Sequence, residues 1–490
     1  MGGTTVLLER TRTICIGYGL IAAVGWPWRR NLSWMSRCGE GIETHDSKYV
    51  NFVEASRRNA EGEAMIPCAH ECRSRRGPTG ATALGMLTAL ILAGSACAQS
   101  GAPIKIGYSM SLTGGLAPNG KSALLAQRIW EEDTNAKGGM LGRPVKLIYY
   151  DDKSSPSEIP SIYTKLLDID KVDLIIGAYG TALTAPAMPI VIQRKKTFVG
   201  LLGLAVNSQF NYPNYFAMIP SGPEAKPAFT KGFFDVAVRQ EPKPQTLAIV
   251  AADQEFSRNA ADGARENMKQ SGLKLVYERT YPPATTDFVP IVRAIAAANP
   301  DLVIVCSYPP DSVGMVRAVN ELGFKPKAIG GAMVGLQSTA IKTQLGPLLN
   351  GFINYEFWLP VQKMQFPGVA DLISRYQARA ASEGVDPLGY YMPPWAYAQL
   401  QVLQQAVEAT KALDDAELAD YIRAHAFTTV VGEIKFGSKG EWAQSRVLQV
   451  QYQNIKGHEI AQFKDMSTQV VVAPSEYASG EVIYPYERAK

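Results

Sequence analysis

The stretch "DLIIGAYGTALTAP" (173–186) places small hydroxyl residues directly after an apolar segment. Its first half is typical of a buried strand and its second half of the start of a helix. The first turn of a helix carries unpaired N–H groups and the positive end of the helix dipole. With the hydroxyls of Thr181 and Thr184 just beyond Gly180, this junction could bind an anion such as a carboxylate. Thr181 could also do no more than cap its own helix.

Comparable side chains follow other predicted strands. Ser109 and Thr113 lie in the glycine-containing segment at the end of the first strand after residue 103, and Tyr179 ends the strand described above. Phe256 and Tyr308 follow strands further along the chain. An aromatic residue at a strand end usually belongs to the core or the rim of a fold, but several around one cleft indicate ligand contacts.

Catalytic motifs give little support for an enzyme. "GLAPNGKS" (115–122) fits the pattern G-x-x-x-x-G-K-[ST] of a phosphate loop, but this short pattern also occurs by chance. There is no G-x-S-x-G turn, and "GAYGTA" is too short for a dinucleotide fingerprint. Only His425 and His458 follow residue 98, so a metal site is not expected. The formal net charge of +4 on 490 residues argues against nucleic-acid binding. We therefore expect a protein without cofactors that binds a ligand and is not an enzyme.

A basic segment, "RSRRGPTG" (73–80), precedes the apolar run 81–93 and the triplet Ala96-Cys97-Ala98. These are the three parts of a secretory signal with an A-x-A cleavage site, and the apolar run is too short to span a bilayer. The sequence thus predicts a signal peptide over 65–98 and export to the periplasm, although a buried helix would also fit the run. Cys97 could carry a lipid anchor, but Gly94 stands where such a site requires Leu.

Residues 1–64 have neither the pattern of a signal nor that of a domain. Because a signal peptide starts near the beginning of a chain, we expect translation to begin at Met65 and 1–64 to be a non-native or disordered extension. Of six cysteines, only Cys306 then belongs to the exported part. A chain of this length buries enough core to fold without a disulfide.

From residue 103 the pattern alternates between strands and helices, which predicts an α/β protein with parallel sheets covered on both faces. Two strand beginnings recur. Lys146 and Lys274 begin similar apolar runs, and so do Asp173 and Asp301, each pair 128 positions apart. The spacing predicts two similar Rossmann-like lobes, although any α/β protein reuses such patterns. Ligands of such lobes bind beyond the carboxyl ends of the strands and in clefts between domains.

The sequence resembles the exported solute-binding proteins of ABC importers, of the branched-chain amino-acid (leucine-binding-protein-like) family with the type I periplasmic-binding fold. The resemblance covers roughly 103–465 and keeps the family's order. Its motifs are "IKIGYSMSLTGG", "NAKGGMLGRPVKLIYYDD", "VDLIIGAYGTALTAPAMP", "KPQTLAIVAADQEFSRNAADG", "PDLVIVCSYPPDSVGMVRAVNELG" and "WAYAQLQVLQQAVEA". It implies two lobes hinged by three crossovers, closure over a small solute, delivery to a membrane permease, and a monomer.

We expect the crossovers near Pro220-Ser221, Phe357–Pro360 and Gln451–Asn454. The resulting division is 103–220 and 358–452 for the first lobe, 221–357 for the second lobe, and 453–490 for the end of the second lobe with a tail. No function is predicted for 465–490. A ligand-sensing domain and an enzyme on the same scaffold are the alternatives from other classes. The sensor requires a membrane span or output domain, and no apolar run of that length follows residue 98.

The family's binding pattern carries over in part: Thr181 matches the hydroxyl that grips a ligand carboxylate, and Phe256 and Tyr308 match aromatic contacts. A second hydroxyl falls at Leu204, and the acid that pairs with a ligand ammonium falls at Ala332. A buried ammonium without an acid is costly, so a hydrophobic or aromatic organic acid is the favoured ligand. An amino acid stays open if Glu255 or Asp253 supplies the charge. The predicted ligand contacts are Ser109, Thr113, Tyr179, Thr181, Thr184, Leu202, Leu204, Phe256, Tyr308, Ala332 and Met333.

Overall fold

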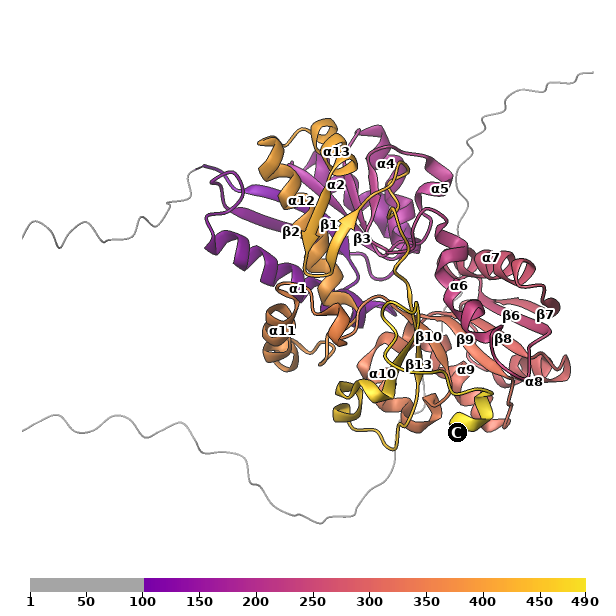
Figure 1. The fold of residues 1–490 in the computed structure, drawn as a ribbon. Helices are drawn as coiled ribbons and strands as arrows, with labels where there is room; N and C mark the ends of the chain where they lie inside the picture. The colour runs from indigo at the N-terminus through magenta and orange to yellow at the C-terminus, as the bar shows by residue number, and fades with distance from the viewer. Residues whose placement is uncertain (1–100) are drawn as a thin grey trace, which may run out of the picture. The chain divides into compact units, whose positions relative to one another are not determined.

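The alternation of strands and helices continues from β1 to β10 without interruption. The computed structural model describes residues 101–490, so the expected extension, the signal peptide and Cys97 lie outside the described residues. Two large sheets and a small hairpin organise this part of the chain (Figure 1). Within 101–490, no helix combines the length and the apolar character needed to cross a membrane.

The first sheet is parallel throughout and has the strand order β2-β1-β3-β4-β5. Its strands are β1 Ile104–Met110, β2 Val145–Asp151, β3 Leu174–Tyr179, β4 Phe198–Leu201 and β5 Tyr215–Ala217. The helices between them are α1 Ala117–Ala136, α2 Ile159–Asp168, α3 Thr181–Thr184, α4 Met188–Gln193 and α5 Asn207–Phe210. Later segments return to this lobe: α11 Val369–Glu383, α12 Met392–Thr410, α13 Asp415–Ala424, β11 Ala426–Thr429 and β12 Gly432–Lys435. In Figure 1 the orange α12 accordingly lies beside the indigo α1.

The second sheet has the order β14-β13-β10-β9-β8-β6-β7. Its strands are β6 Thr246–Ala252, β7 Lys274–Tyr281, β8 Leu302–Ser307, β9 Ala328–Met333, β10 Ile353–Glu356, β13 Leu448–Tyr452 and β14 Gln469–Ala473. Its helices are α6 Ala225–Ala237, α7 Glu255–Gln270, α8 Val289–Ala297, α9 Pro309–Glu321 and α10 Thr339–Leu345. The predicted parallel central sheets are confirmed, and the second sheet adds one antiparallel edge, where β13 pairs with both β10 and β14.

The predicted internal repeat is confirmed by the strand orders. The order β2-β1-β3-β4-β5 of the first sheet recurs as β7-β6-β8-β9-β10 in the second. Asp173 and Asp301 have the same structural role. Each carboxylate accepts a hydrogen bond from a backbone N–H at the start of a neighbouring strand, that of Lys105 in β1 at 2.8 Å and that of Thr246 in β6 at 3.1 Å. The spacing of 128 therefore reflects equivalent strands in two lobes.

Three segments connect the lobes. The chain leaves the first sheet after β5 and leaves the second after β10 to form α11. The expected third crossover near Gln451–Asn454 is wrong, and so is the assignment of 448–452 to the first lobe, because Leu448–Tyr452 already forms β13. The third crossover comes earlier, where the N–H of Arg446 donates to the carbonyl oxygen of Pro220 at 2.8 Å. The first and third connections are therefore bonded to each other.

The C-terminal segment belongs to the second lobe. After β14 the chain continues along this sheet, and the side chain of Gln451 donates to the carbonyl oxygen of Ile483 at 2.9 Å. The N–H of Tyr486 donates to Lys327 at 2.8 Å. The segment is thus hydrogen-bonded to the second lobe but adds no strand to its sheet.

Candidate functional site

A narrow cavity lies where the strand ends of the two lobes meet. The centre of a water molecule could occupy only about 30 Å³ within this cavity. The surrounding side chains therefore nearly fill the cavity. Its lining comes from both lobes and from the segments beside the crossovers. The lining residues are Leu116, Tyr179, Gly180, Thr181, Ala182, Leu202, Ile219, Phe229, Phe256, Tyr308, Val334, Tyr355, Phe357 and Tyr391.

Thr181 brings a hydroxyl to this cavity. The backbone reverses at Gly180, whose φ of +83° is open to glycine, and α3 then begins at Thr181. Gly180 is therefore the residue before the helix, and Thr181 does not cap it. Instead, the Thr181 Oγ1 accepts a hydrogen bond from the backbone N–H of Leu204 at 2.9 Å. Because this bond uses a lone pair of the oxygen, the hydroxyl proton is free to be donated to a ligand.

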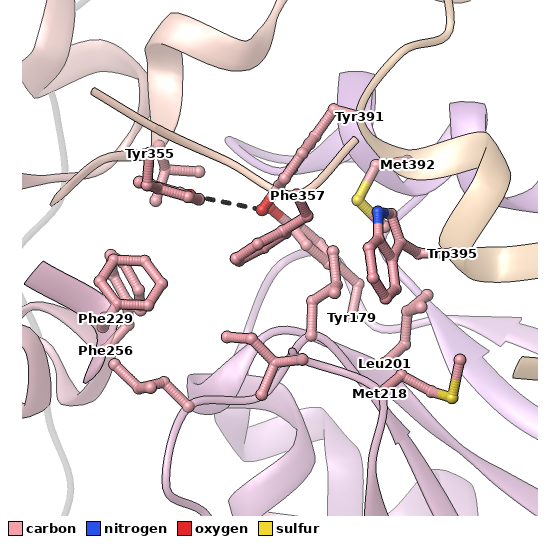
Figure 2. Close-up of a cluster of buried hydrophobic side chains, with 14 of the residues drawn as sticks. Tyr179, Leu201, Met218, Phe229, Phe256, Tyr355, Phe357, Tyr391, Met392 and Trp395 are labelled. Carbon is pink, nitrogen blue, oxygen red and sulfur yellow. Dashed lines mark hydrogen bonds between the residues drawn. The ribbon is translucent and has the colours of Figure 1, made fainter. Parts of the chain in front are cut away.

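Aromatic rings form the opposite wall, chiefly from the second lobe. Phe229 of α6 is fully buried, and its ring centroid lies 5.4 Å from that of Phe256 and 4.6 Å from that of Tyr355. Phe357 stacks on Tyr391 at 6.0 Å with 24° between the ring planes. Figure 2 shows these rings converging from separate segments of the chain. Such a wall suits a flat, apolar ligand.

Phenolic hydroxyls supply most of the remaining polar character. The side-chain amide of Asn119 donates to the Tyr179 hydroxyl at 2.8 Å. The hydroxyls of Tyr355 and Tyr391 lie 3.4 Å apart, as the dashed line in Figure 2 marks. Burial raises the pKa of all three tyrosines, so each hydroxyl keeps its proton at neutral pH.

None of the lining residues is charged. Carboxylates line an adjoining, wider cavity of about 530 Å³, which shares Leu116, Ala182 and Tyr308 with the narrow one and forms its mouth. There Asp253 pairs with Arg258 at 2.7 Å, and burial raises the pKa of Glu255. Carboxylates thus lie at the entrance, while the narrow cavity offers neutral donors and apolar rings.

Comparisons with known proteins decide the family. The sequence profile described as periplasmic binding protein matches residues 103–458, which is most of the chain. The chain belongs to the periplasmic binding protein family. It is 24% identical to the Leu/Ile/Val-binding protein of Escherichia coli (strain K12) over 343 residues, covering 69% of this chain and 88% of that relative. As a member of this family it is a solute-binding protein and not an enzyme.

Solved structures of the family share the fold. A branched-chain amino acid transporter substrate-binding protein from Streptococcus pneumoniae, in complex with isoleucine, aligns with a TM-score of 0.60 at 16% identity, covering 78% of this chain and all of that one. A solute-binding protein of an ABC transporter from Rhodopseudomonas palustris, in complex with 3,4-dihydroxybenzoic acid, aligns with a TM-score of 0.61 at 17% identity, covering 73% and 94%.

The structure brings five of the predicted contacts of this periplasmic binding protein to the cavity, namely Tyr179, Thr181, Leu202, Phe256 and Tyr308. Three predicted hydroxyl residues lie elsewhere. Ser109 is buried within β1. The hydroxyl of Thr113 donates to Asp151 at 2.7 Å on the exposed surface. The hydroxyl of Thr184 donates back to the carbonyl oxygen of Ala178 at 2.8 Å. Local carboxylate and backbone acceptors have taken the hydroxyls of Thr113 and Thr184.

The three remaining predicted contacts also lie outside the lining. Leu204 is fully buried, and only its backbone reaches Thr181. Ala332 and Met333 are buried within β9, where the backbone of Met333 exchanges two hydrogen bonds with the side chain of Asn354, each at 2.9 Å. Val334, one residue further along, reaches the cavity in their place.

Several lining residues were missing from the prediction. Tyr355 and Phe357 lie where the chain leaves the second sheet, and Tyr391 directly precedes α12. The signal was present, since "NYEFW" and "GYYMPPW" are dense in aromatic residues next to a predicted crossover and a predicted helix. Within residues 101–490, no group of three or more potential metal-ligating side chains is found.

Proposed function

We propose that this protein is the exported solute-binding component of an ABC importer and that it captures a hydrophobic or aromatic carboxylic acid between its two lobes. The observation that carries the proposal is the composition of the cavity, whose 14 lining residues include seven aromatic side chains and no charged one. Such a lining stabilises a flat apolar body and provides no counter-charge for an ammonium group.

The carboxylate is assigned to the start of α3. There the Thr181 hydroxyl has an unused proton, and the first backbone N–H groups of the helix have no acceptor within the helix. Donors on neutral groups can hold a carboxylate without a buried cation, and hydrogen bonds to a charged acceptor are stronger than neutral ones. An ammonium group in the same cavity would lose its hydration without gaining an acid.

An amino acid is the second candidate ligand. The relatives that bind leucine, isoleucine and valine favour it, and Glu255 could approach the cavity from its mouth. Glu255 lines only the wider outer cavity, so an ammonium would have to bind at the entrance.

Isothermal titration calorimetry separates the two ligands. The mature protein is first unfolded and refolded to remove any co-purified ligand, and is then titrated with benzoate, 4-hydroxybenzoate, cinnamate and leucine. We expect the aromatic acids to bind and leucine to give no heat of binding. Tight binding of leucine would refute the organic-acid proposal. Mass spectrometry of small molecules released by the first unfolding step identifies the natural ligand directly.

We further propose export through the signal peptide at 65–98, residence in the periplasm as a monomer, and delivery of the ligand to a membrane permease. The basic and apolar segments before residue 98 support export, and the ABC importers served by the structural relatives support the permease. N-terminal sequencing of the exported protein should find a mature end close to residue 99. A mature end upstream of residue 65 would contradict the proposed start and signal.

A further inference from the structure

Three tyrosines of the cavity form what we call the tyrosine hydroxyl cluster: Tyr179, Tyr355 and Tyr391. They come from the end of β3, from β10 and from the residue before α12, so the two lobes and the second crossover meet at this point. The ring centroid of Tyr391 lies 6.4 Å from those of both Tyr179 and Tyr355, and all three residues are less than 9% exposed. Three phenolic oxygens are therefore held together beside an otherwise apolar wall.

The hydrogen bonds of the cluster leave hydroxyl protons without an acceptor. Asn119 can only donate through its amide nitrogen, so Tyr179 accepts that bond and keeps its own proton. One proton is used between Tyr355 and Tyr391, whichever of the two donates. Even if Tyr179 donates to Tyr391, one O–H of the three still lacks an acceptor among the described residues. The cluster as a whole is thus a hydrogen-bond donor.

Ionisation does not remove this surplus. Burial raises the pKa of each of the three hydroxyls, and the phenol of Tyr179 acts on both Tyr355 and Tyr391 in the same direction. A buried donor without a partner is unfavourable, so an acceptor atom supplied by the ligand would be strongly preferred at this point.

We propose that the tyrosine hydroxyl cluster binds a second oxygen of the ligand, separate from the carboxylate held by Thr181. The preferred ligand is then an aromatic acid that carries a ring hydroxyl, because a phenolic oxygen can accept from the cluster and donate back to it. This inference rests on the proposed function and names the substituent that the protein selects. An aromatic acid without the ring oxygen leaves the surplus proton of the cluster unpaired.

The cluster and Thr181 could instead grip the same carboxylate. The two arrangements differ in what happens when the ring oxygen is removed. If both donors hold one carboxylate, benzoate binds as well as its hydroxylated forms, and loss of a phenol weakens all of them equally. If the cluster holds a second oxygen, only the hydroxylated acids depend on it.

The experiment is calorimetry on the mature protein with benzoate, 3-hydroxybenzoate and 4-hydroxybenzoate, for the wild type and Tyr391→Phe. We expect the wild type to bind one hydroxybenzoate at least about tenfold more tightly than benzoate. In Tyr391→Phe this ratio should fall to less than about threefold. The matched control is Tyr376→Phe, because Tyr376 is an equally buried tyrosine whose hydroxyl donates to Ser122 at 2.9 Å, outside the cavity. It should keep the wild-type ratio.

Circular dichroism confirms that each variant is folded before titration. A wild type that binds benzoate and hydroxybenzoates equally, or a Tyr391→Phe variant that keeps the wild-type ratio, overturns the role of the cluster while the proposed function stands. Failure of every aromatic acid to bind the wild type overturns the proposed function, and this inference with it. The two failures are therefore distinguishable.

Discussion

The two lobes have the same strand order but supply different chemistry to the cavity between them. The first lobe contributes Thr181 and the start of α3, which are small groups with hydrogen-bond donors. At the equivalent position after β8 the second lobe has Tyr308, which lies edge-on to Phe256 with ring centroids 6.0 Å apart. One lobe is therefore suited to an anionic group, and the other to an apolar body.

This difference shows that the scaffold and the recognition chemistry are separable. The carboxylates of Asp173 and Asp301 hold equivalent strands in place, and both lie at the amino ends of strands, away from the cavity. The residues that differ between the lobes lie at the carboxyl ends, where loop sequences can change without disturbing the sheet. A ligand that is polar on one side and flat and apolar on the other would match this asymmetry.

The two lobes also differ in how they accommodate a buried glutamate, and this difference affects the stability of the fold. In the second lobe, Glu356 lies 3.6 Å from Lys342, and both side chains are at most 2% exposed. In the first lobe, Glu441 is also buried, but its Oε2 has no hydrogen-bond partner among the described residues and no salt bridge to it is found there. Burial raises the pKa of Glu356 to about 7 and that of Glu441 to about 8.

The largest predicted effect is the different response of these two glutamates to the same substitution. At pH 8, Glu441→Gln should raise the free energy of unfolding by about 1–3 kcal/mol, because an uncompensated carboxylate becomes neutral. At the same pH, Glu356→Gln should change it by less than about 1 kcal/mol, because the gain from removing a carboxylate with a raised pKa is offset by the loss of the counter-charge of Lys342. Urea denaturation of each variant measures both values. The comparison fails if both substitutions change stability by the same amount.

The pH dependence sharpens this test. A carboxyl group with a folded-state pKa above its unfolded value keeps its proton in the folded protein after the unfolded chain has lost it. Stability then falls as pH rises from about 4.5 towards 8 for Glu441, and levels off above that. The advantage of Glu441→Gln should therefore disappear near pH 5, where the native carboxyl is already protonated. An advantage that persists at pH 5 would show that charge is not its cause.

Much of the fold could be predicted because its signals are local. Fully buried strands such as β3 and β8 and the aspartates before them repeat in the sequence with constant spacing. The antiparallel edge could not be predicted in the same way. β13 follows a long excursion into the first lobe, and its pairing with β10 depends on contacts between residues about 95 positions apart, which no sequence period records.

The site was predictable only where it lies next to a strand end. Tyr179 and Thr181 follow β3 directly, so their place near the cavity comes from the topology. Thr184 has the same chemistry one helical turn later, yet its hydroxyl bonds to the strand it has just left. Tyr391 reaches the cavity through the packing of α12 against α1, a contact between distant parts of the chain. Side-chain direction and long-range packing decide such cases.

The second-largest effect is expected from Thr181→Val, which tests the hydrogen-bond donor that the first lobe contributes to the cavity. The substitution removes the free hydroxyl proton while keeping the shape of the side chain, so the affinity for an aromatic acid should fall by about 10- to 100-fold. The matched control is Thr184→Val, which removes a hydroxyl that serves only Ala178. It should cost stability and leave the affinity within about threefold of the wild type. Calorimetry with the best-bound hydroxybenzoate distinguishes the two threonines, and equal losses would contradict the assignment of the carboxylate to Thr181.

The smallest predicted effect concerns a hydrogen bond that joins the two lobes. The side chain of Asn259 in α7 of the second lobe donates to the carbonyl oxygen of Leu204 at 3.1 Å, and the N–H of Leu204 donates in turn to Thr181. Because this contact connects the lobes only while they are closed, Asn259→Ala should favour the open form and weaken the affinity about fivefold, mainly by faster ligand release.

Asn267 provides the control for this last prediction, since it lies on the same helix and its side chain bonds to Pro227 at 2.7 Å within the second lobe. Asn267→Ala should lower the free energy of unfolding by about 1 kcal/mol without changing the release rate. Stopped-flow dissociation measures the rate for both variants. If the two asparagines affect release equally, closure does not depend on the Leu204 peptide, and the donor and aromatic sides act on the ligand independently of each other.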